Sequence, residues 1–414
     1  MKRLGIELYG ELIGTLQGAD RATFDFEADP EAIEHYGVNS RILSAAIPLN
    51  PKTNRAKAKQ RRNYFQELLP EGDQLAAMYA AARLASGDVL GFLAHYGRDV
   101  AGALQIWDLD DPREPATPEL LPVTEDGVRD LLDKPLMYPL ANRPAMGKTS
   151  LAGVQPKIVL ARTGDGWAQA AGGAPSTHIL KPLVQQHPTL IYDEEYGARI
   201  ARALGLATHA TWIAEFAGAP ALVIERFDRD LAVSGGRIHQ EDFNQALGAG
   251  GNAKYQEFGG VVSLRRVSEV LSVVGAGADR TVLARMIVLA VALGNLDMHA
   301  KNLGLIHHPN GSVGLAPAYD IVPHTHLAGV DGRMALAIGR EYRHAALTRD
   351  HLVAEVASWG LRTADDVVDE SLVAVAEAVD DEVPLPGADP QVYGSVLQFT
   401  ENLCKGRPVG VWSH

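Results

Sequence analysis

The chain has 414 residues, enough for two or three domains that each bury a core, and its 46% apolar and 21% charged residues are ordinary for a globular protein. Its formal net charge of −13 argues against non-specific binding of nucleic acid over the whole surface. One cysteine excludes an internal disulfide, no apolar run reaches membrane-spanning length, and early charges argue against a signal peptide, so we expect a cytoplasmic protein that does not contact membranes.

The N-terminal residues predict a small α+β domain. Residues 3–18 alternate between apolar and polar positions and break at Gly10 and Gly14, which indicates two short strands in a hairpin. Residues 41–110 are predicted to be mainly helical. We therefore expect an accessory domain over residues 1–110.

One segment of this domain departs from the acidic average of the chain. Six basic residues lie within eleven positions, namely Lys52, Arg55, Lys57, Lys59, Arg61 and Arg62. Such a run usually forms a solvated, mobile face. The alternative is a patch that faces phosphates or an acidic partner.

A proline-rich and acidic linker is predicted over residues 111–139, and residues 140–230 then contain strands around 157–162, 178–181 and 221–226. A loop suited to phosphates precedes the first of these strands. The small residues Ala152 and Gly153 would let the backbone approach phosphate oxygens closely, and Lys157 begins the strand behind them.

The next two strands supply further features of a nucleotide site. Lys181 lies on the middle strand, where it can reach the α- and β-phosphates of a nucleotide. A helix predicted over residues 193–204 opens with Glu194 and Glu195, either of which can pair with this lysine, and we favour Glu195. Residues 222–229 are typical of a buried strand that leaves into a charged hinge.

A second glycine-rich segment, residues 248–254, resembles a phosphate-binding loop but does not fit the pattern. That pattern requires Gly before the lysine and Ser or Thr after it, whereas Ala253 precedes Lys254 and Tyr255 follows it. We expect a flexible loop near the substrate side instead.

The most informative residues follow an apolar run over residues 286–293, which predicts the end of a buried helix. Asp297 stands five residues before Asn302 and about two dozen before Asp320. Phosphoryl transfer needs one carboxylate to orient the attacking hydroxyl, and an amide oxygen and another carboxylate to hold Mg²⁺ on ATP. The alternative is that Asp297 and Asn302 merely cap a turn.

A hairpin is predicted between these polar positions. Residues 303–306 and 313–315 are apolar, and Asn310-Gly311 between them is a strong turn signal. The order of catalytic loop, hairpin and metal-binding Asp is the order found in protein-kinase-like folds. Residues 231–414 are expected to form the helical lobe that carries it.

Together these segments resemble the HipA family of bacterial serine/threonine kinases, the toxins of HipBA-type toxin–antitoxin modules. The match spans nearly the whole chain and rests on residues 68–73, 97–103, 150–157, 177–181, 225–229, 240–245, 295–302 and 319–320. The resemblance implies an α+β, two-lobed protein-kinase-like fold with a PI3/4-kinase-like catalytic loop. It also implies an N-terminal accessory domain, a nucleotide-binding lobe over residues 140–230 and a helical lobe after it.

The resemblance also implies roles for individual residues. Asp297 matches the catalytic residue, and Asn302 and Asp320 match the magnesium ligands. The ATP-binding residues would be Ala152, Gly153, Val154, Gln155, Pro156, Lys157, Lys181, Glu225, Arg226, Phe227, His299, Lys301, Asn302, Tyr319 and Asp320. Ser150 matches a serine that HipA kinases phosphorylate on themselves to silence their activity. The sequence departs from ordinary protein kinases at His299, which is found at this place in lipid kinases, and after Asp320, where Ile-Val replaces Phe-Gly.

The expected function is an ATP- and Mg²⁺-dependent serine/threonine protein kinase, the toxin of a type II toxin–antitoxin system. By resemblance its substrate would be a translation component such as glutamyl-tRNA synthetase. Its partner would be a small helix-turn-helix antitoxin of the HipB type, through which it mainly meets operator DNA. Two alternatives remain, a small-molecule kinase and a catalytically silent co-repressor. The intact Lys181, Asp297, Asn302 and Asp320 argue against the silent co-repressor.

Overall fold

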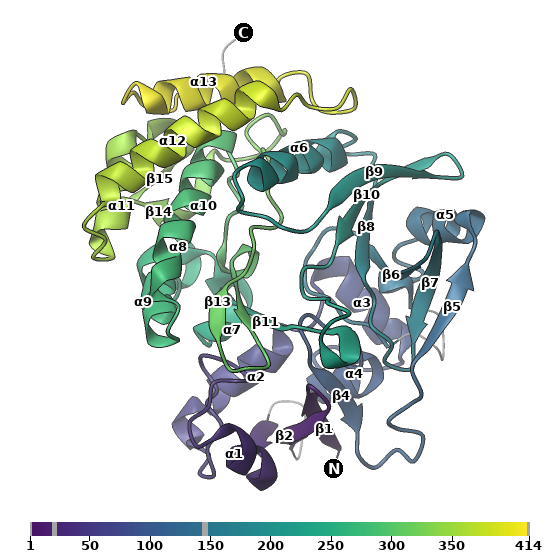
Figure 1. The fold of residues 1–414 in the computed structure, drawn as a ribbon. Helices are drawn as coiled ribbons and strands as arrows, with labels where there is room; N and C mark the ends of the chain where they lie inside the picture. The colour runs from purple at the N-terminus through teal and green to yellow at the C-terminus, as the bar shows by residue number, and fades with distance from the viewer. Residues whose placement is uncertain (1, 19–22, 143–147, 412–414) are drawn as a thin grey trace.

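The computed structural model describes residues 2–18, 23–142 and 148–411, which fold into three packed regions (Figure 1). Each region has its own cluster of buried apolar side chains. Within the described residues, no helix is both long and apolar enough to cross a membrane. The combination of mainly antiparallel sheets and separate helices confirms the predicted α+β class.

The first region is a four-stranded antiparallel sheet with short helices around it, at the base of the molecule in Figure 1. Its strands lie in the order β3-β2-β1-β4 and comprise β1 Arg3–Leu8, β2 Glu11–Gln17, β3 Asp25–Ala28 and β4 Gln105–Asp108. Its helices are α1 Pro30–Tyr36, α2 Ala58–Gln66, α3 Gly72–Ala81 and α4 Val89–Tyr96. Because β4 pairs with β1, the end of this accessory domain returns to its first strand.

The hairpin predicted over residues 3–18 is confirmed as β1 and β2, with Gly10 in its turn at a positive φ. Gly14 does not break the chain, however. It lies inside β2, where a Cβ atom would come 2.3 Å from the carbonyl oxygen of Glu27 in the neighbouring strand. The glycine therefore serves the close approach of β3 and not a turn.

The second region is a six-stranded sheet in the order β5-β7-β6-β8-β10-β9. The strands are β5 Glu119–Val123, β6 Ile158–Thr163, β7 Gly166–Ala171, β8 His178–Pro182, β9 Thr211–Phe216 and β10 Ala219–Glu225. Helices α5 Glu125–Asp133 and α6 Leu190–Ala203 pack beside it. The three strands predicted from the sequence correspond to β6, β8 and β10.

The predicted linker over residues 111–139 needs correction, because much of it belongs to this sheet. Residues 119–123 form β5, which pairs with β7, and the buried face of α5 joins the core of the sheet. The sequence does not predict this strand because it contains Pro122, and proline cannot donate a hydrogen bond to a neighbouring strand. It is tolerated here because β5 is an edge strand.

The third region is mainly helical. Its helices are α7 Phe243–Ala246, α8 Gln256–Gly259, α9 Leu264–Val273, α10 Arg280–Leu293, α11 Arg349–Ser358, α12 Ala364–Asp381 and α13 Val392–Cys404. Two small sheets complete it, built from β11 His239–Asp242, β12 Gly304–His307 and β13 Val313–Leu315, and from β14 Arg333–Ile338 and β15 Glu341–Arg343. The predicted buried helix is the C-terminal half of α10, and the predicted hairpin is β12 with β13.

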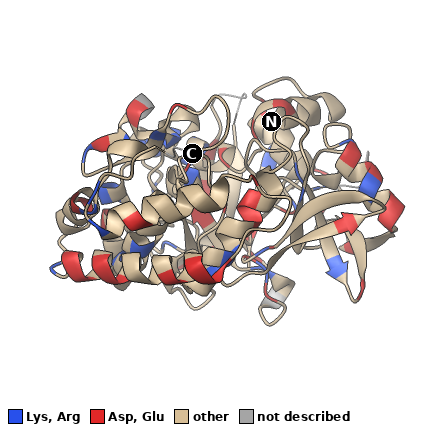
Figure 2. Ribbon diagram, turned by 90° about the horizontal axis from the view of Figure 1, so that it is seen from above, with Lys and Arg blue, Asp and Glu red and all other residues tan. Residues whose placement is uncertain are grey.

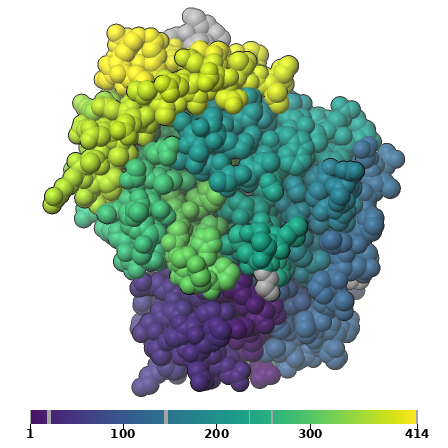
Figure 3. Space-filling view, in the orientation of Figure 1, coloured from purple at the N-terminus to yellow at the C-terminus, as the bar shows by residue number. Residues whose placement is uncertain are grey.

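The accessory domain is not a separate appendage. In the space-filling view its purple residues lie directly beneath the teal and green parts of the chain (Figure 3). Ser44 Oγ donates to Glu241 Oε2 at 2.6 Å, and the Ala45 N–H donates to Glu241 Oε1 at 2.8 Å. Glu241 lies on β11, so this buried carboxylate joins the accessory domain to the helical region.

The predicted basic run is largely solvated. Lys52, Arg55, Lys57 and Lys59 are exposed. Arg62 is partly buried, and Arg61 is buried, with its guanidinium donating two hydrogen bonds to Asp25. Acidic positions recur along the helices of the third region (Figure 2), and most of those on α12 are exposed.

Candidate active site

A cavity of about 460 Å³ lies where the three regions meet. Its wall contains Leu68 and Glu71 of the accessory domain together with Lys181 and Phe227 of the sheet region. The helical region contributes the polar loop after α10 and the segment around Asp320. The predicted catalytic, metal-binding and ATP-binding residues thus converge on one cavity, with one exception among the nucleotide-loop positions that is described below.

Lys181 lies at the centre of a buried ion cluster. Its Nζ atom is 2.7 and 2.9 Å from the two carboxylate oxygens of Glu194 and 2.7 Å from Asp320 Oδ1. Burial alone would lower the pKa of Lys181, but Asp320 and Glu194 raise it above its ordinary value. The lysine therefore remains a cation that faces the cavity.

The preference for Glu195 as the partner of Lys181 was wrong. Its carboxylate accepts hydrogen bonds from Arg199, one helical turn further along α6, at 2.9 and 3.0 Å. Consecutive helical residues point in directions about 100° apart, so only one of the two glutamates can face β8. Which one does so depends on how α6 is rotated against the sheet.

Asp320 adopts a backbone conformation that is unusual for a residue with a side chain. Its φ is +55°, in the left-handed region that Asp tolerates better than most residues. The neighbouring Tyr319 is fixed by a hydrogen bond from its hydroxyl to the Lys301 carbonyl, at 2.8 Å. Burial alone would raise the pKa of Asp320, but Lys181 holds it well below its ordinary value. The carboxylate is therefore ionised at the cavity wall.

The loop after α10 is closed by short hydrogen bonds. Helix α10 ends at Leu293 and is capped by Gly294, which has φ +67°, and the Asn295 N–H donates to the Ala290 carbonyl at 2.8 Å. The side-chain amide of Asn302 donates to the Asp297 carbonyl at 2.9 Å. Asn302 therefore does close a turn, but the Asp297 carboxylate lines the cavity with its side chain 45% exposed.

The surroundings of the Asp297 carboxyl raise its pKa above that of an exposed aspartate. Burial and the charge of Asp320 raise its pKa to about 6. The Tyr255 hydroxyl donates to its Oδ1 atom at 3.3 Å. His299 lies 3.7 Å away, and burial, together with the charge of Lys254, lowers its pKa to about 4, so its ring is neutral at neutral pH.

The residues present fit a magnesium ion. Because the Asn302 amide donates to backbone, its oxygen is the atom left to ligate a metal. Asp320 offers a carboxylate on the same cavity wall. Mg²⁺ that accompanies a nucleotide is usually held by one or two protein oxygen ligands plus phosphates and water, which is the donor set available here.

The predicted phosphate loop lines the cavity, apart from Pro156, which the structure does not bring to its wall. Gly153 has φ +117°, and a Cβ atom there would come 2.3 Å from Lys157 Nζ. That ammonium donates to the Ala152 carbonyl at 2.7 Å. Burial, helped by the charge of Lys181, lowers the pKa of Lys157 to about 8.

The predicted hinge residues have two different orientations. The Phe227 ring lies 5.4 Å from Tyr319 and 5.7 Å from His209, which gives the cavity an aromatic side. Arg226 also borders the cavity, but its guanidinium donates two hydrogen bonds to the Asp228 carboxylate, at 2.9 and 2.8 Å. The charge of Arg226 is therefore not directed to a nucleotide, so any contact of this predicted hinge residue with a nucleotide would come from its backbone.

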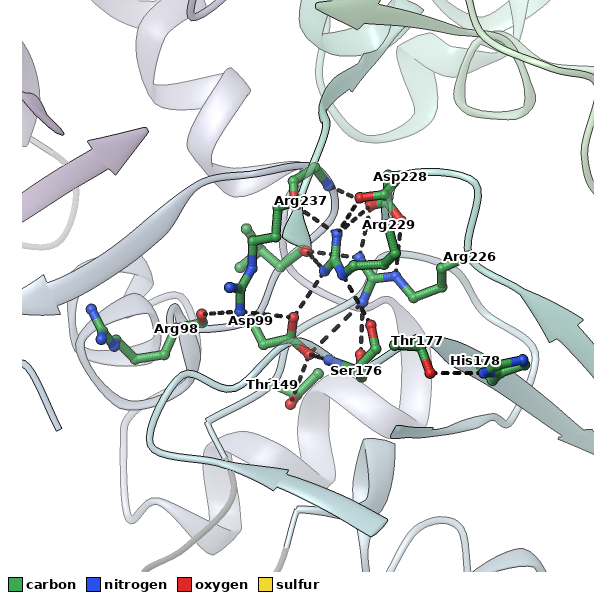
Figure 4. Close-up of polar contacts among 12 residues, drawn as sticks. Arg98, Asp99, Thr149, Ser176, Thr177, His178, Arg226, Asp228, Arg229 and Arg237 are labelled. Carbon is green, nitrogen blue, oxygen red and sulfur yellow. Dashed lines mark hydrogen bonds and ion pairs between the residues drawn. The ribbon is translucent and has the colours of Figure 1, made fainter. Parts of the chain in front are cut away.

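Arg226 belongs to a buried cluster in which Arg226, Arg229 and Arg237 surround Asp99 and Asp228 (Figure 4). Burial alone would raise the pKa of Asp99, but the three arginines hold it below its ordinary value. Asp99 comes from the accessory domain and the arginines from the chain after β10. The cluster therefore fixes the hinge to the accessory domain.

Lys301 lines the cavity, but its ammonium is held by carboxylates. Its Nζ atom is 2.5 Å from Glu67 Oε2 and 3.4 Å from Glu71 Oε1. Lys254, predicted to lie in a flexible loop, is likewise buried and donates to Glu71 Oε2 at 2.9 Å. The sequence analysis assigned no role to these two glutamates, although Glu71 lies in the segment 68–73 that carries part of the family resemblance.

Ser150 is fully buried beside the phosphate loop. Its Oγ atom donates to the Leu68 carbonyl at 2.8 Å, and its N–H donates to the Asp99 carbonyl at 3.0 Å. A phosphate on this oxygen would have to displace the first of these bonds. In the conformation described here, the hydroxyl is therefore not open to a kinase active site.

Comparison with known proteins gives consistent results for both halves of the chain. Residues 4–107 match the HipA N-terminal domain, and residues 149–383 match the HipA-like C-terminal domain. The chain is 31% identical over 357 residues to the putative kinase Y4mE of Sinorhizobium fredii, covering 83% of this chain and 84% of that protein. It is 29% identical over 381 residues to the serine/threonine-protein kinase toxin HipA of Shewanella oneidensis, covering 87% and 84%.

A solved structure leads to the same comparison. The complex of Shewanella oneidensis HipA, HipB and their operator DNA contains a chain that matches this one with a TM-score of 0.76 at 26% identity. The match covers 97% of this chain and 96% of that one. The likeness therefore includes the accessory domain as well as the sheet region and the helical region.

Proposed function

Because the chain belongs to the HipA family of kinases, we propose that it transfers the γ-phosphoryl group of ATP to a serine or threonine of a protein. The observation that carries this proposal is the meeting of Lys181, Asp297, Asn302 and Asp320 in one cavity. A cation, a half-exposed carboxylate and two oxygen ligands are the parts that phosphoryl transfer requires.

In this proposal Lys181 binds the α- and β-phosphates, and Glu194 keeps the ammonium in place. The phosphate loop lies over the nucleotide, with Gly153 leaving room for close approach. Phe227 and the adjoining backbone contact the base. Asn302 and Asp320 would hold Mg²⁺, which neutralises phosphate charge when it is bound.

The proposed role of Asp297 is to orient the acceptor hydroxyl. The hydroxyl oxygen forms a bond to the γ-phosphorus, and the bond from that phosphorus to the bridging oxygen of ADP breaks. The proton of the hydroxyl passes to the Asp297 carboxylate, which must be ionised beforehand. The raised pKa of this carboxyl makes it a better proton acceptor than an exposed aspartate.

The biological role we propose is that of a growth-inhibiting cytoplasmic toxin paired with a small helix-turn-helix antitoxin. The related Shewanella oneidensis structure contains HipB and operator DNA, which supports a partner of this kind. The net charge of −13 favours contact with DNA mainly through that partner. The exposed basic run from Lys52 to Lys59 is the candidate for any direct contact. Glutamyl-tRNA synthetase is the proposed substrate.

Quantitative phosphoproteomics tests the proposal directly. Brief induction of the wild-type chain should raise phosphorylation at serine or threonine sites on a small set of proteins, including glutamyl-tRNA synthetase. Asp297→Ala at the same expression level should give none of these changes. Phosphorylation that is equal in both strains would refute the kinase assignment, and a set without glutamyl-tRNA synthetase would refute the proposed substrate alone.

A further inference from the structure

Residues 67–71 of the accessory domain lie against three separate parts of the proposed active site. The first part is the phosphate loop with the adjoining Ser150, to which residues 67–71 make two contacts. The Ser150 hydroxyl donates to the Leu68 carbonyl at 2.8 Å, and the Glu71 N–H donates to the Gly153 carbonyl at 3.1 Å. These contacts use the backbone of residues 67–71, so they do not depend on which side chains stand there.

The second contact is to the loop that carries Asp297. The Glu67 carboxylate accepts from Lys301 at 2.5 Å, and Glu71 lies 3.4 Å from the same ammonium. Lys301 is buried, and it lies on the turn between Asp297 and β12. A buried ammonium needs a carboxylate partner, and the accessory domain provides two of them.

The third contact is to the glycine-rich loop before α8. The Gly251 N–H donates to Glu67 Oε1 at 2.8 Å, and Lys254 Nζ donates to Glu71 Oε2 at 2.9 Å. The next residue, Tyr255, donates its hydroxyl to Asp297 Oδ1 at 3.3 Å. A continuous path of contacts therefore leads from Glu71 through Lys254 and Tyr255 to the Asp297 carboxylate.

We propose that Glu67 and Glu71 are positioning residues of the phosphotransfer reaction, and that the accessory domain thereby completes the active site. The inference rests on the proposed kinase function. Glu67 binds Lys301 and so fixes the loop that carries Asp297. Glu71 binds Lys254 and so fixes the loop whose Tyr255 donates to the Asp297 carboxylate. Neither carboxylate bonds to Lys181 or Asp320, so their loss should affect the chemical step more than ATP binding.

The first test compares Glu71→Gln with Asp73→Asn in the full chain. Glu71 is 30% exposed at its side chain, so its replacement is compatible with folding. Asp73 is an exposed acid in the first turn of α3 and serves as the matched control. We expect Glu71→Gln to lower kcat by about tenfold to a hundredfold, since small displacements of reacting groups have effects of this size. ATP affinity, measured by calorimetry, should stay within about twofold of wild type, and Asp73→Asn should match wild type in both measurements.

A double-variant cycle tests the path itself. Lys254→Met removes the same ion pair from the other side, and the double variant with Glu71→Gln should be no slower than the slower single variant. Additive losses would contradict the path through Lys254. We expect Glu71→Asp to retain more of the wild-type kcat than Glu71→Gln does, because a carboxylate remains.

Two results would overturn the inference. One is a kcat for Glu71→Gln within about twofold of an active wild type. The other is a loss of kcat and ATP affinity together, in proportion to the folded fraction seen by thermal denaturation, because that is the behaviour of a merely structural residue. An inactive wild-type chain would contradict the proposed function instead, which keeps the two failures distinguishable.

Discussion

At the scale of single residues, the site depends on a choice between two neighbouring glutamates. Glu194 binds Lys181, whereas Glu195 binds Arg199. Glu194→Gln should therefore raise the KM for ATP by about tenfold, the cost of weakening one charge-assisted hydrogen bond. Glu195→Gln should lower thermal stability but leave that KM unchanged. Steady-state kinetics and melting curves of the two variants distinguish these effects, and equal KM values would contradict the assignment.

Asp297 makes the reaction dependent on pH. Its pKa is raised to about 6, so its carboxyl becomes protonated, and unable to accept a proton, as the pH falls through that value. We expect kcat/KM to be constant near neutral pH and to fall on the acid side, with a midpoint of about 6. Tyr255→Phe removes a hydrogen bond that lowers this pKa, so the acid limb should move to higher pH. If Tyr255→Phe left the pH profile unchanged, the group that titrates on the acid side would not be Asp297.

Ser150 combines burial with a position next to the phosphate loop. Its phosphorylation would break the bond to the Leu68 carbonyl and place about two negative charges in a closed site. We expect autophosphorylation at Ser150, ejection of the loop, and loss of ATP binding in the modified protein. Ser150→Ala should retain ATP binding. Mass spectrometry of the chain after incubation with ATP tests this, and phosphate found only at other residues would refute it.

The spacing of residues in the sequence predicts which residues line the site, but not which side chains they bind. Asp297, Asn302 and Asp320 line one cavity, as a kinase pattern requires. The environments of Arg226 and Lys301 could not be predicted, because their carboxylate partners depend on which faces of distant segments meet. A lysine or arginine in a motif therefore indicates proximity to a site more reliably than contact with a ligand.

At the scale of elements, the phosphate loop depends on the absence of a side chain at Gly153. A Cβ atom there would meet Lys157 Nζ, and the residue has φ +117°. We expect Gly153→Ala to displace that ammonium and weaken ATP binding by about tenfold. Gly164→Ala is the control, because it also has a positive φ but meets nothing within 4 Å. Equal ATP affinity in the two variants, measured by calorimetry, would contradict this role for Gly153.

The elements differ in how readily the sequence predicts them. The buried half of α10 and the β12–β13 hairpin are evident because apolar runs and an Asn-Gly turn are local signals. Strand β5 is not, because its Pro122 and acidic surroundings resemble a linker. Its place at the sheet edge, which makes the proline acceptable, is a property of the assembled fold.

At the scale of the whole molecule, the accessory domain is bound to both lobes by buried charges. Asp99 binds the arginines after β10, and Glu67 and Glu71 bind lysines of the helical region. These contacts join residues far apart in the sequence, so no local pattern predicts them. The sequence therefore predicts separate domains, but not the dependence of one domain on another.

In the proposed reaction Asp297 orients the acceptor hydroxyl and takes its proton, while other residues bind ATP. The most direct measurement is single-turnover phosphotransfer by the purified Asp297→Ala variant, with ATP affinity measured on the same preparation. We predict that the phosphotransfer rate falls by at least about a hundredfold, whereas the dissociation constant for ATP with Mg²⁺ stays within about threefold of wild type. A variant that transfers phosphate at the wild-type rate, or that loses ATP binding together with its activity, would contradict this role for Asp297.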